Sequence, residues 1–241
     1  MARVIPALEV PLCLRAHLKT FSSFFPDKVR FNKSDQSVQF TEEMSFELRV
    51  SMSYFKFITD VEDVMENLEL VLADMLLLSS HPPVRASEGD RRYFLLTKLF
   101  FYELLRVRDA FQRFLKRLEQ DGLMSKEDRR STRQLIEEPL SEHYLVRNVY
   151  LHGHSLPRSD EELDLLLLRM TSEAGYQERL VPLNGGPPLE YPHALRVLAT
   201  KRRDGLREVA SDMVSFFQNI INTTAEWTSH HRFAAPAQSE P

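Results

Sequence analysis

Hydrophobic residues recur at three- and four-residue steps over most of the chain, which is the pattern of helices that bury one face. The first such run comprises Phe57, Val61, Val64, Met65, Leu68, Val71, Leu72 and Met75. Thr41 is followed by two glutamates, as at the start of a helix, and prolines follow His81. We therefore predict a helix from Thr41 to about Ser80. Hydrophobic residues alternate from Phe46 to Met52, so a strand there is the alternative.

A second long helix is predicted from about Arg91 to Gln120, after a polar loop that runs from His81 to Asp90. Its wide hydrophobic set predicts burial on more than one side. Asp121-Gly122 should end this helix, because glycine is favoured just beyond a helix terminus.

Ser125 with the acids that follow predicts a shorter helix to about Glu137. Pro139 suits a first helical turn, so a separate helix is predicted from about Leu140. Gly153 is a candidate for the left-handed position that ends this helix, with His152 at its last turn.

Two further helices are predicted, at about Glu161–Thr171 and His193–Thr228. Between them, Asn184-Gly185 indicates a small β-hairpin insertion near residues 176–191. Residues 1–40 are irregular, and a small hairpin and a loose arm are equally compatible with their pattern. The sequence thus predicts an all-α helical bundle with long antiparallel helices, a single domain over residues 41–230 and a disordered tail over residues 231–241.

Composition narrows the class of protein. The 241 residues are 43% hydrophobic and 27% charged with a formal net charge of −4, as in a globular protein without a general affinity for nucleic acid. The single cysteine, Cys13, excludes an intramolecular disulfide and a cysteine-cluster metal site. No signal peptide or uninterrupted apolar span is evident, so we expect a cytoplasmic protein without a membrane partner.

The densest chemistry lies between Arg147 and His154. Arginine holds phosphate oxygens in a planar fork, and histidine exchanges protons near neutral pH. Arg147 and His152 are five residues apart, about 140° around a continuous helix. They would converge if the helix ends at His152, or if two chains share one site in a symmetric dimer.

The run Arg147-Asn148-Val149-Tyr150-Leu151-His152 resembles the motif of the HEPN superfamily, which comprises all-helical ribonucleases and nucleotide-binding domains. In this family an arginine, usually followed by a polar residue, precedes a histidine by four to six positions. The resemblance covers the motif, its flanking helices and the all-α layout. Toxins of the family that are silenced by nucleotide transfer have a tyrosine two places after the histidine, where this chain has His154.

The resemblance implies metal-independent RNA cleavage by a homodimer without a cofactor. It further implies a role in a toxin–antitoxin or defence system, with an antitoxin or other regulatory protein as a partner. Arg147 would hold the scissile phosphate, His152 would act as general acid or base, and Asn148 would orient the substrate or the histidine. His154 and Tyr150 would support these residues. Candidate RNA-binding residues are Arg129, Arg130, Arg133 and Arg158.

Other interpretations remain open. A HEPN-like domain can bind nucleotide or RNA without cleaving it. The protein can also be a helical scaffold in which Arg147 and His152 only satisfy the carbonyls at a helix end. The basic cluster Lys201, Arg202, Arg203 and Arg207 is expected at the surface.

Overall fold

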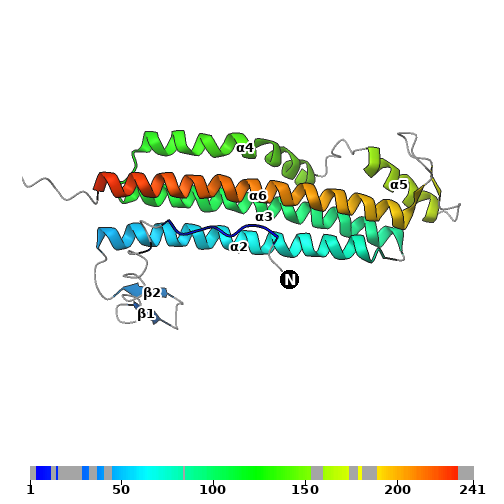
Figure 1. The fold of residues 1–241 in the computed structure, drawn as a ribbon, viewed down its shortest axis with the longest axis horizontal. Coiled ribbons are helices and arrows are strands. Elements are labelled where there is room, and N and C mark those ends of the chain that lie inside the picture. The colour runs from blue at the N-terminus through cyan, green and yellow to red at the C-terminus, as the bar shows by residue number, and fades with distance from the viewer. Residues whose placement is uncertain are drawn as a thin grey trace, which may run out of the picture. The chain divides into compact units, whose positions relative to one another are not determined.

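The computed structural model describes residues 4–11, 15, 29–32, 37–40, 45–83, 85–152, 160–173, 179–180 and 189–232. Most of these residues are helical, which confirms the all-α prediction. Figure 1 shows the long helices as unbroken elements. Their bounds are α2 Phe46–Ser80, α3 Ala86–Gln120, α4 Lys126–His152, α5 Asp160–Glu173 and α6 Tyr191–Arg232.

Short strands accompany the helices. Strands β1 (Val29–Asn32) and β2 (Ser37–Phe40) pair antiparallel, with Val29 opposite Phe40. Strands β3 (Arg179–Leu180) and β4 (Leu189–Glu190) pair over two residues each. The Asn184-Gly185 turn lies outside the described residues, so the hairpin insertion remains a prediction.

Helix α2 begins at Phe46 rather than Thr41, and the alternative of a strand near Phe46 is wrong. Ser45 explains the start of the helix. Its hydroxyl accepts a hydrogen bond from the Leu48 amide at 3.3 Å, and its carbonyl accepts one from the Arg49 amide at 3.1 Å.

Helix α3 begins at Ala86, so the predicted loop to Asp90 is too long. The Asp90 side chain is buried, and its oxygens contact Tyr191 and Arg169. The polar segment from Ala86 to Asp90, which predicts a loop, instead forms the first turn of α3. The helix ends as predicted, before Gly122, which has a φ of 71°.

Helix α4 is a single helix, and the predicted break at Pro139 is wrong. Ile136 and Leu140 are buried on either side of the proline, so packing maintains the helix across the missing amide. Its predicted start is confirmed: the Asp128 amide donates to the Ser125 hydroxyl at 3.0 Å, and that hydroxyl donates to the Asp128 carboxylate at 2.7 Å.

The chain divides into two compact units. Unit 1 comprises Met1–Pro6, Val64–Arg106 and Glu138–Asp212, and unit 2 comprises Ala7–Asp63, Val107–Glu137 and Met213–Pro241. The motif falls in unit 1, whereas Arg129, Arg130 and Arg133 fall in unit 2.

An aromatic cluster forms the core of unit 2. The ring of Phe57 stacks on that of Phe114 with centroids 4.7 Å apart, and Tyr54 meets Phe114 edge-on at 4.9 Å. Phe57 also contacts Phe111 and, from α6, Phe217. Because later residues of α2 meet earlier residues of α3, these two helices run antiparallel here.

In unit 1, α2 and α3 also run antiparallel: Asn67 donates to Glu103 at 3.0 Å, and Arg92 lies 3.9 Å from Asp74. Hydrophobic side chains of α2, α3, α5 and α6 fill the core, among them Leu68, Met75, Phe100, Leu104, Leu168 and Leu195. The second half of α4, from Glu138 to His152, belongs to the same unit as this core.

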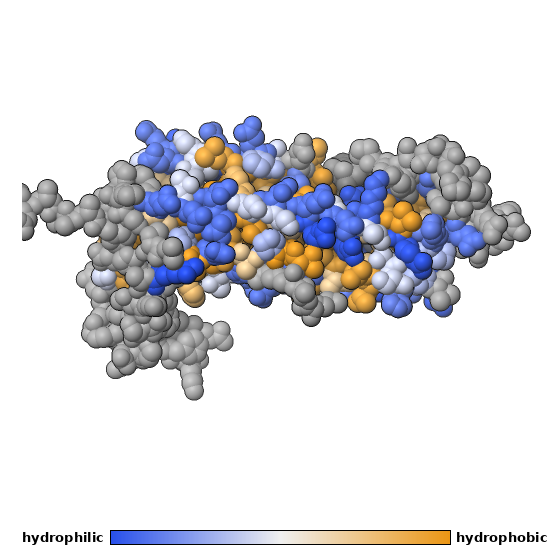
Figure 2. All heavy atoms as spheres, viewed as in Figure 1, coloured by the Kyte–Doolittle hydropathy of each residue, from blue (hydrophilic) through white to orange (hydrophobic). Residues whose placement is uncertain are grey.

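Some large hydrophobic side chains reach the surface of the helices, including Leu70 and Leu145. Figure 2 shows hydrophobic patches on the visible face that hydrophilic side chains interrupt. Within the described part of the chain, no helix combines the length and the apolar character needed to span a bilayer.

Candidate functional site

The Arg147–His152 motif lies at the end of α4. The backbone is helical through the motif as far as His152, and the predicted helix end at Gly153 lies outside the described residues, so it stays a prediction. Asn148 is exposed. The side chains of Arg147, Tyr150 and His152, and all of His154 and Arg158, lie outside what the structure describes. Their convergence on one substrate therefore remains a prediction.

Helix geometry places the motif relative to its neighbours on α4. His143 lies four residues before Arg147, on the same face of the helix and about 6 Å along its axis. The His143 ring lies 5.8 Å from the ring of Phe101 on α3, with 32° between their planes. The turn before the motif is thus positioned against α3.

Phe101 also borders a cavity of about 380 Å³. The other lining residues come from α6 and are Leu198, Lys201, Arg202, Gly205, Leu206 and Val209. The cavity is therefore mainly apolar with two cationic side chains, a lining suited to an anion that carries an apolar group. The cavity lies in unit 1, and one of its lining residues, Phe101, is the residue that contacts His143.

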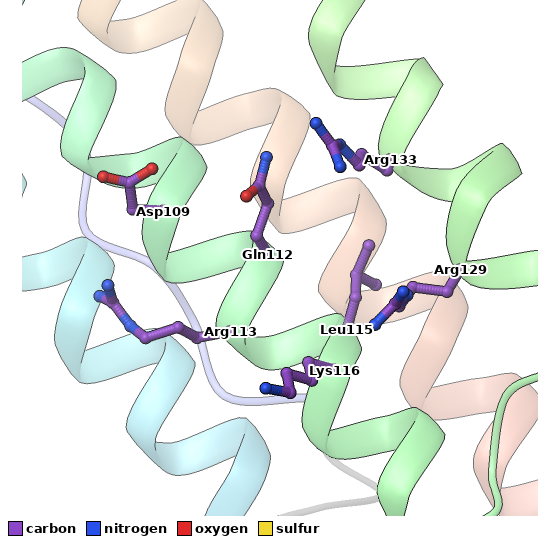
Figure 3. A pocket seen from close by; sticks show the side chains of 7 residues that line it. All are labelled: Asp109, Gln112, Arg113, Leu115, Lys116, Arg129 and Arg133. Carbon is purple, nitrogen blue, oxygen red and sulfur yellow. The ribbon is translucent and has the colours of Figure 1, made fainter. Parts of the chain in front are cut away.

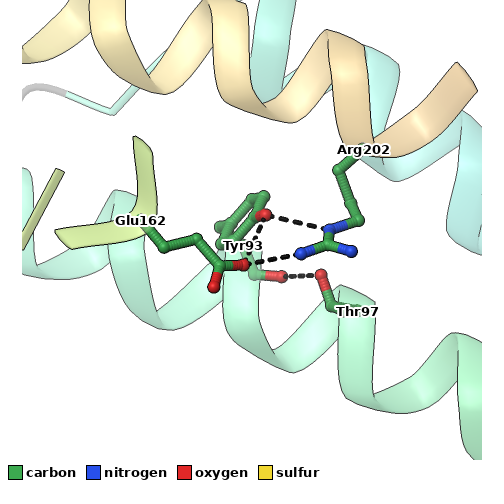
Figure 4. Close-up of polar contacts among 4 residues, drawn as sticks. All are labelled: Tyr93, Thr97, Glu162 and Arg202. Atoms are coloured by element: carbon green, nitrogen blue, oxygen red, sulfur yellow. Dashed lines mark hydrogen bonds and ion pairs between the residues drawn. The ribbon is translucent and has the colours of Figure 1, made fainter. Parts of the chain in front are cut away.

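Arg202 is held in a buried polar network with Tyr93 and Glu162. Its Nη2 donates to Glu162 Oε1 at 2.7 Å, its Nε donates to Tyr93 Oη at 3.1 Å, and Tyr93 Oη donates to the same Glu162 oxygen at 3.1 Å. Figure 4 shows these polar groups meeting at one point. The network joins α3, α5 and α6, and it holds Arg202 in its position in the lining of the cavity.

Burial determines the protonation of this network. It raises the pKa of Tyr93 above its usual range, so the phenol stays neutral. Burial alone lowers the pKa of Arg202, but the contacts with Tyr93 and Glu162 outweigh it and raise that pKa. The guanidinium therefore stays cationic beside a neutral phenol and a carboxylate that is only 6% exposed.

A second buried network lies nearby in unit 1. Tyr191 Oη donates to Asp90 Oδ1 at 3.1 Å, and Arg169 Nη1 lies 3.2 Å from Asp90 Oδ2. Asp90 is 1% exposed. Burial, followed by the negative charge of Asp90, raises the pKa of Tyr191 above its usual range. These contacts position the start of α3 against α5 and α6.

Sequence reasoning missed both networks. Asp90 was assigned to a polar loop, and Arg202 was expected at the surface, whereas its side chain is 33% exposed and is bonded on two sides. The partners of Arg202 lie 40 and 109 residues away in the chain. No local spacing signals such pairs, so only the fold reveals them.

Three of the four predicted RNA-binding arginines, Arg129, Arg130 and Arg133, occupy the first half of α4, in unit 2. Arg129 pairs with Glu119 at 2.7 Å, and Arg133 pairs with Glu137 at 2.7 Å. Arg130 is exposed. Arg129 and Arg133 therefore lie on one side of α4, one turn apart, where both line a groove between α3 and α4. Arg130 does not line this groove.

Among the described residues, no group of three histidine, cysteine or carboxylate side chains is placed to hold a metal ion. No protein-family model, curated protein or solved structure matches the chain. The function must therefore be argued from the residues themselves.

Proposed function

We propose that the protein is a HEPN-like, metal-independent endoribonuclease whose catalytic residues are Arg147 and His152. The observation that carries the proposal is that the whole motif, from Arg147 to His152, lies on one helix of a mostly helical protein. Because the backbone is helical from Arg147 to His152, the two residues lie about 140° apart around α4, which favours a site that two chains share. The all-helical fold and the exposed position of Asn148 support the same assignment.

The proposed reaction uses the 2′-hydroxyl of RNA as an internal nucleophile. Its proton passes to a base, the 2′-oxygen bonds to phosphorus, and the phosphorus–O5′ bond breaks as O5′ takes a proton. Arg147 neutralises the charge on the phosphate oxygens, and His152 transfers the protons. Positioning and proton transfer are sufficient for this chemistry, because nucleophile and phosphate belong to one molecule. The products are a 2′,3′-cyclic phosphate and a 5′-hydroxyl.

One histidine per chain must serve as both base and acid, or two chains must each supply one. We propose the second arrangement, a composite site in a homodimer. Mixing chains that carry Arg147→Ala with chains that carry His152→Ala should then restore part of the activity. A stable monomer in light scattering, with full activity, would rule out this arrangement.

Cleavage of a mixed RNA in the presence of a chelator tests the proposal. Arg147→Ala and His152→Ala should each lower the rate by about a hundredfold or more, the usual loss when a charge-stabilising donor or a proton-transferring group is removed. Matched controls are Arg91→Ala and His81→Ala, which change exposed residues of the same types outside the motif.

Circular dichroism should show that all four variants stay folded. Wild-type rates in the Arg147→Ala and His152→Ala variants would overturn the proposal. RNA or nucleotide binding without any cleavage would instead favour a non-catalytic HEPN-like domain. Absence of both activities would favour a helical scaffold.

A further inference from the structure

A basic groove lies between α3 and α4 in unit 2. Its volume is about 370 Å³, and Figure 3 shows the side chains that line it. They are Asp109, Gln112, Arg113, Leu115 and Lys116 from α3, with Arg129 and Arg133 from α4. Positions 109, 112, 113 and 116 follow the three- and four-residue steps of one helix face, so a single face of α3 presents most of the groove.

Among the described residues, the lining has four cationic side chains and one carboxylate. Three of the cations already have an acidic neighbour: Arg113 lies 3.3 Å from Asp60, and the other two are the Arg129 and Arg133 pairs with glutamates. The side chains of Arg113 and Arg133 are 55% and 50% exposed, and ion pairs at such exposure are weak. A guanidinium has five N–H donors, so an arginine in a single ion pair can still bind a phosphate.

Gln112 adds an observation that points to a ligand. Its Nε2 is buried and has no hydrogen-bond acceptor among the described residues. In Figure 3 its amide end is turned toward the side of the groove on which Arg133 lies. A buried donor without an acceptor is unfavourable, and an oxygen of a bound anion would supply the missing acceptor.

From this geometry we infer that the groove binds a phosphodiester of a single-stranded RNA, with Gln112, Lys116, Arg129 and Arg133 around the phosphate. The donors are all N–H groups, which suits phosphate oxygens. Asp109 favours a ligand with one charge per nucleotide over a triphosphate, because it repels closely spaced charges. The volume also exceeds what a bare ion needs. The inference rests on the proposed function for the choice of RNA.

Fluorescence anisotropy with a labelled, fully 2′-O-methylated oligoribonucleotide tests this inference. This probe has no free 2′-hydroxyl, so binding is measured without cleavage. Arg133→Ala and Lys116→Ala should each weaken binding by about tenfold and reduce the slope of log affinity against log salt by about one. Arg130→Ala is the matched control, because it removes the same charge from an exposed position of α4 outside the groove, and its effect should stay below about twofold.

Gln112→Glu provides a second, opposite perturbation. The new carboxylate should pair with the groove arginines and exclude phosphate, so binding should fall by about tenfold or more without a lower melting temperature. Equal weakening by Arg130→Ala and Arg133→Ala would overturn the inference, since general surface charge would then explain binding. Tighter binding of ATP than of the oligonucleotide at the same groove would also overturn it.

The outcomes separate this inference from the proposed function. Adding Arg133→Ala should weaken probe binding by about the same factor in the Arg147→Ala background as in wild type, because the groove contributes to binding independently of the proposed catalytic residues. Groove-dependent binding by a protein that never cleaves RNA would refute the ribonuclease and leave the groove site standing. If the protein cleaves RNA but the groove variants bind the probe as tightly as wild type does, the groove site is refuted and the proposed ribonuclease function is not.

Discussion

Replacing each of two helical glycines by alanine should change stability in opposite directions. Gly89 lies in α3 and Gly205 lies in α6. A Cβ at Gly89 would lie 2.5 Å from Tyr191 Oη and 2.7 Å from Leu195 Cδ2. A Cβ at Gly205 would have no neighbouring atom within 4 Å. The same substitution is therefore opposed by contacts at one site and unopposed at the other.

The expected magnitudes follow from these contacts. Alanine in a helix interior is favoured over glycine by about 0.5–1 kcal/mol, so Gly205→Ala should stabilise the fold by that amount. At Gly89 the same gain is opposed by about 1–3 kcal/mol of overpacking. Displacement of the Tyr191 hydroxyl also disturbs its hydrogen bond to Asp90, worth about 1.5–3 kcal/mol for a charged acceptor. Gly89→Ala should therefore destabilise the fold by about 2–4 kcal/mol.

Urea unfolding, followed by circular dichroism, measures both changes. Adding Tyr191→Phe to Gly89→Ala removes the nearest clashing atom, so the double variant should be less destabilised than the sum of the two single variants. Stability of Gly89→Ala equal to that of Gly205→Ala would refute the close approach of Tyr191 to α3.

Three further outcomes are expected. Burial raises the pKa of Tyr93 and Tyr191, so the folded state holds these protons more tightly than the unfolded state. The contribution of the two phenols to folding stability is therefore complete below about pH 10, and it is lost as pH rises above that value. Above about pH 10, phenolate absorbance should show fewer ionised tyrosines in the native than in the urea-unfolded protein. Glu162→Ala should cost about 3 kcal/mol in urea unfolding, because it removes one partner of a buried ion pair, and a change below about 1 kcal/mol would contradict the network. Phe57→Ala should cost about 3–5 kcal/mol by removing the centre of the aromatic core, and a near-neutral effect would argue against that packing.

Hydrophobic periodicity predicted the long helices well, because burial of one face is a property of many residues together. Helices α2, α3 and α6 therefore appear at nearly the expected places. Single-residue rules were less reliable. Pro139 was read as a helix start, but the buried side chains of Ile136 and Leu140 outweigh the loss of one helical hydrogen bond.

The candidate site was only partly accessible to sequence reasoning. The helical backbone of the motif was predicted correctly, whereas the helix end at Gly153 lies outside the described residues and stays a prediction. The groove around Gln112 was half foreseen, through Arg129 and Arg133, because basic residues stand out in a sequence. Gln112 and Lys116 were not foreseen, because only the packing of α3 against α4 places them in the same groove as Arg129 and Arg133.

Pro139 has a consequence for how α4 exchanges its amide hydrogens. The proline has no amide, so the carbonyl of Leu135, one turn earlier, lacks its usual helical donor. The amides just after Pro139 should therefore exchange faster than those of the turn that Ser125 caps, although both belong to one helix.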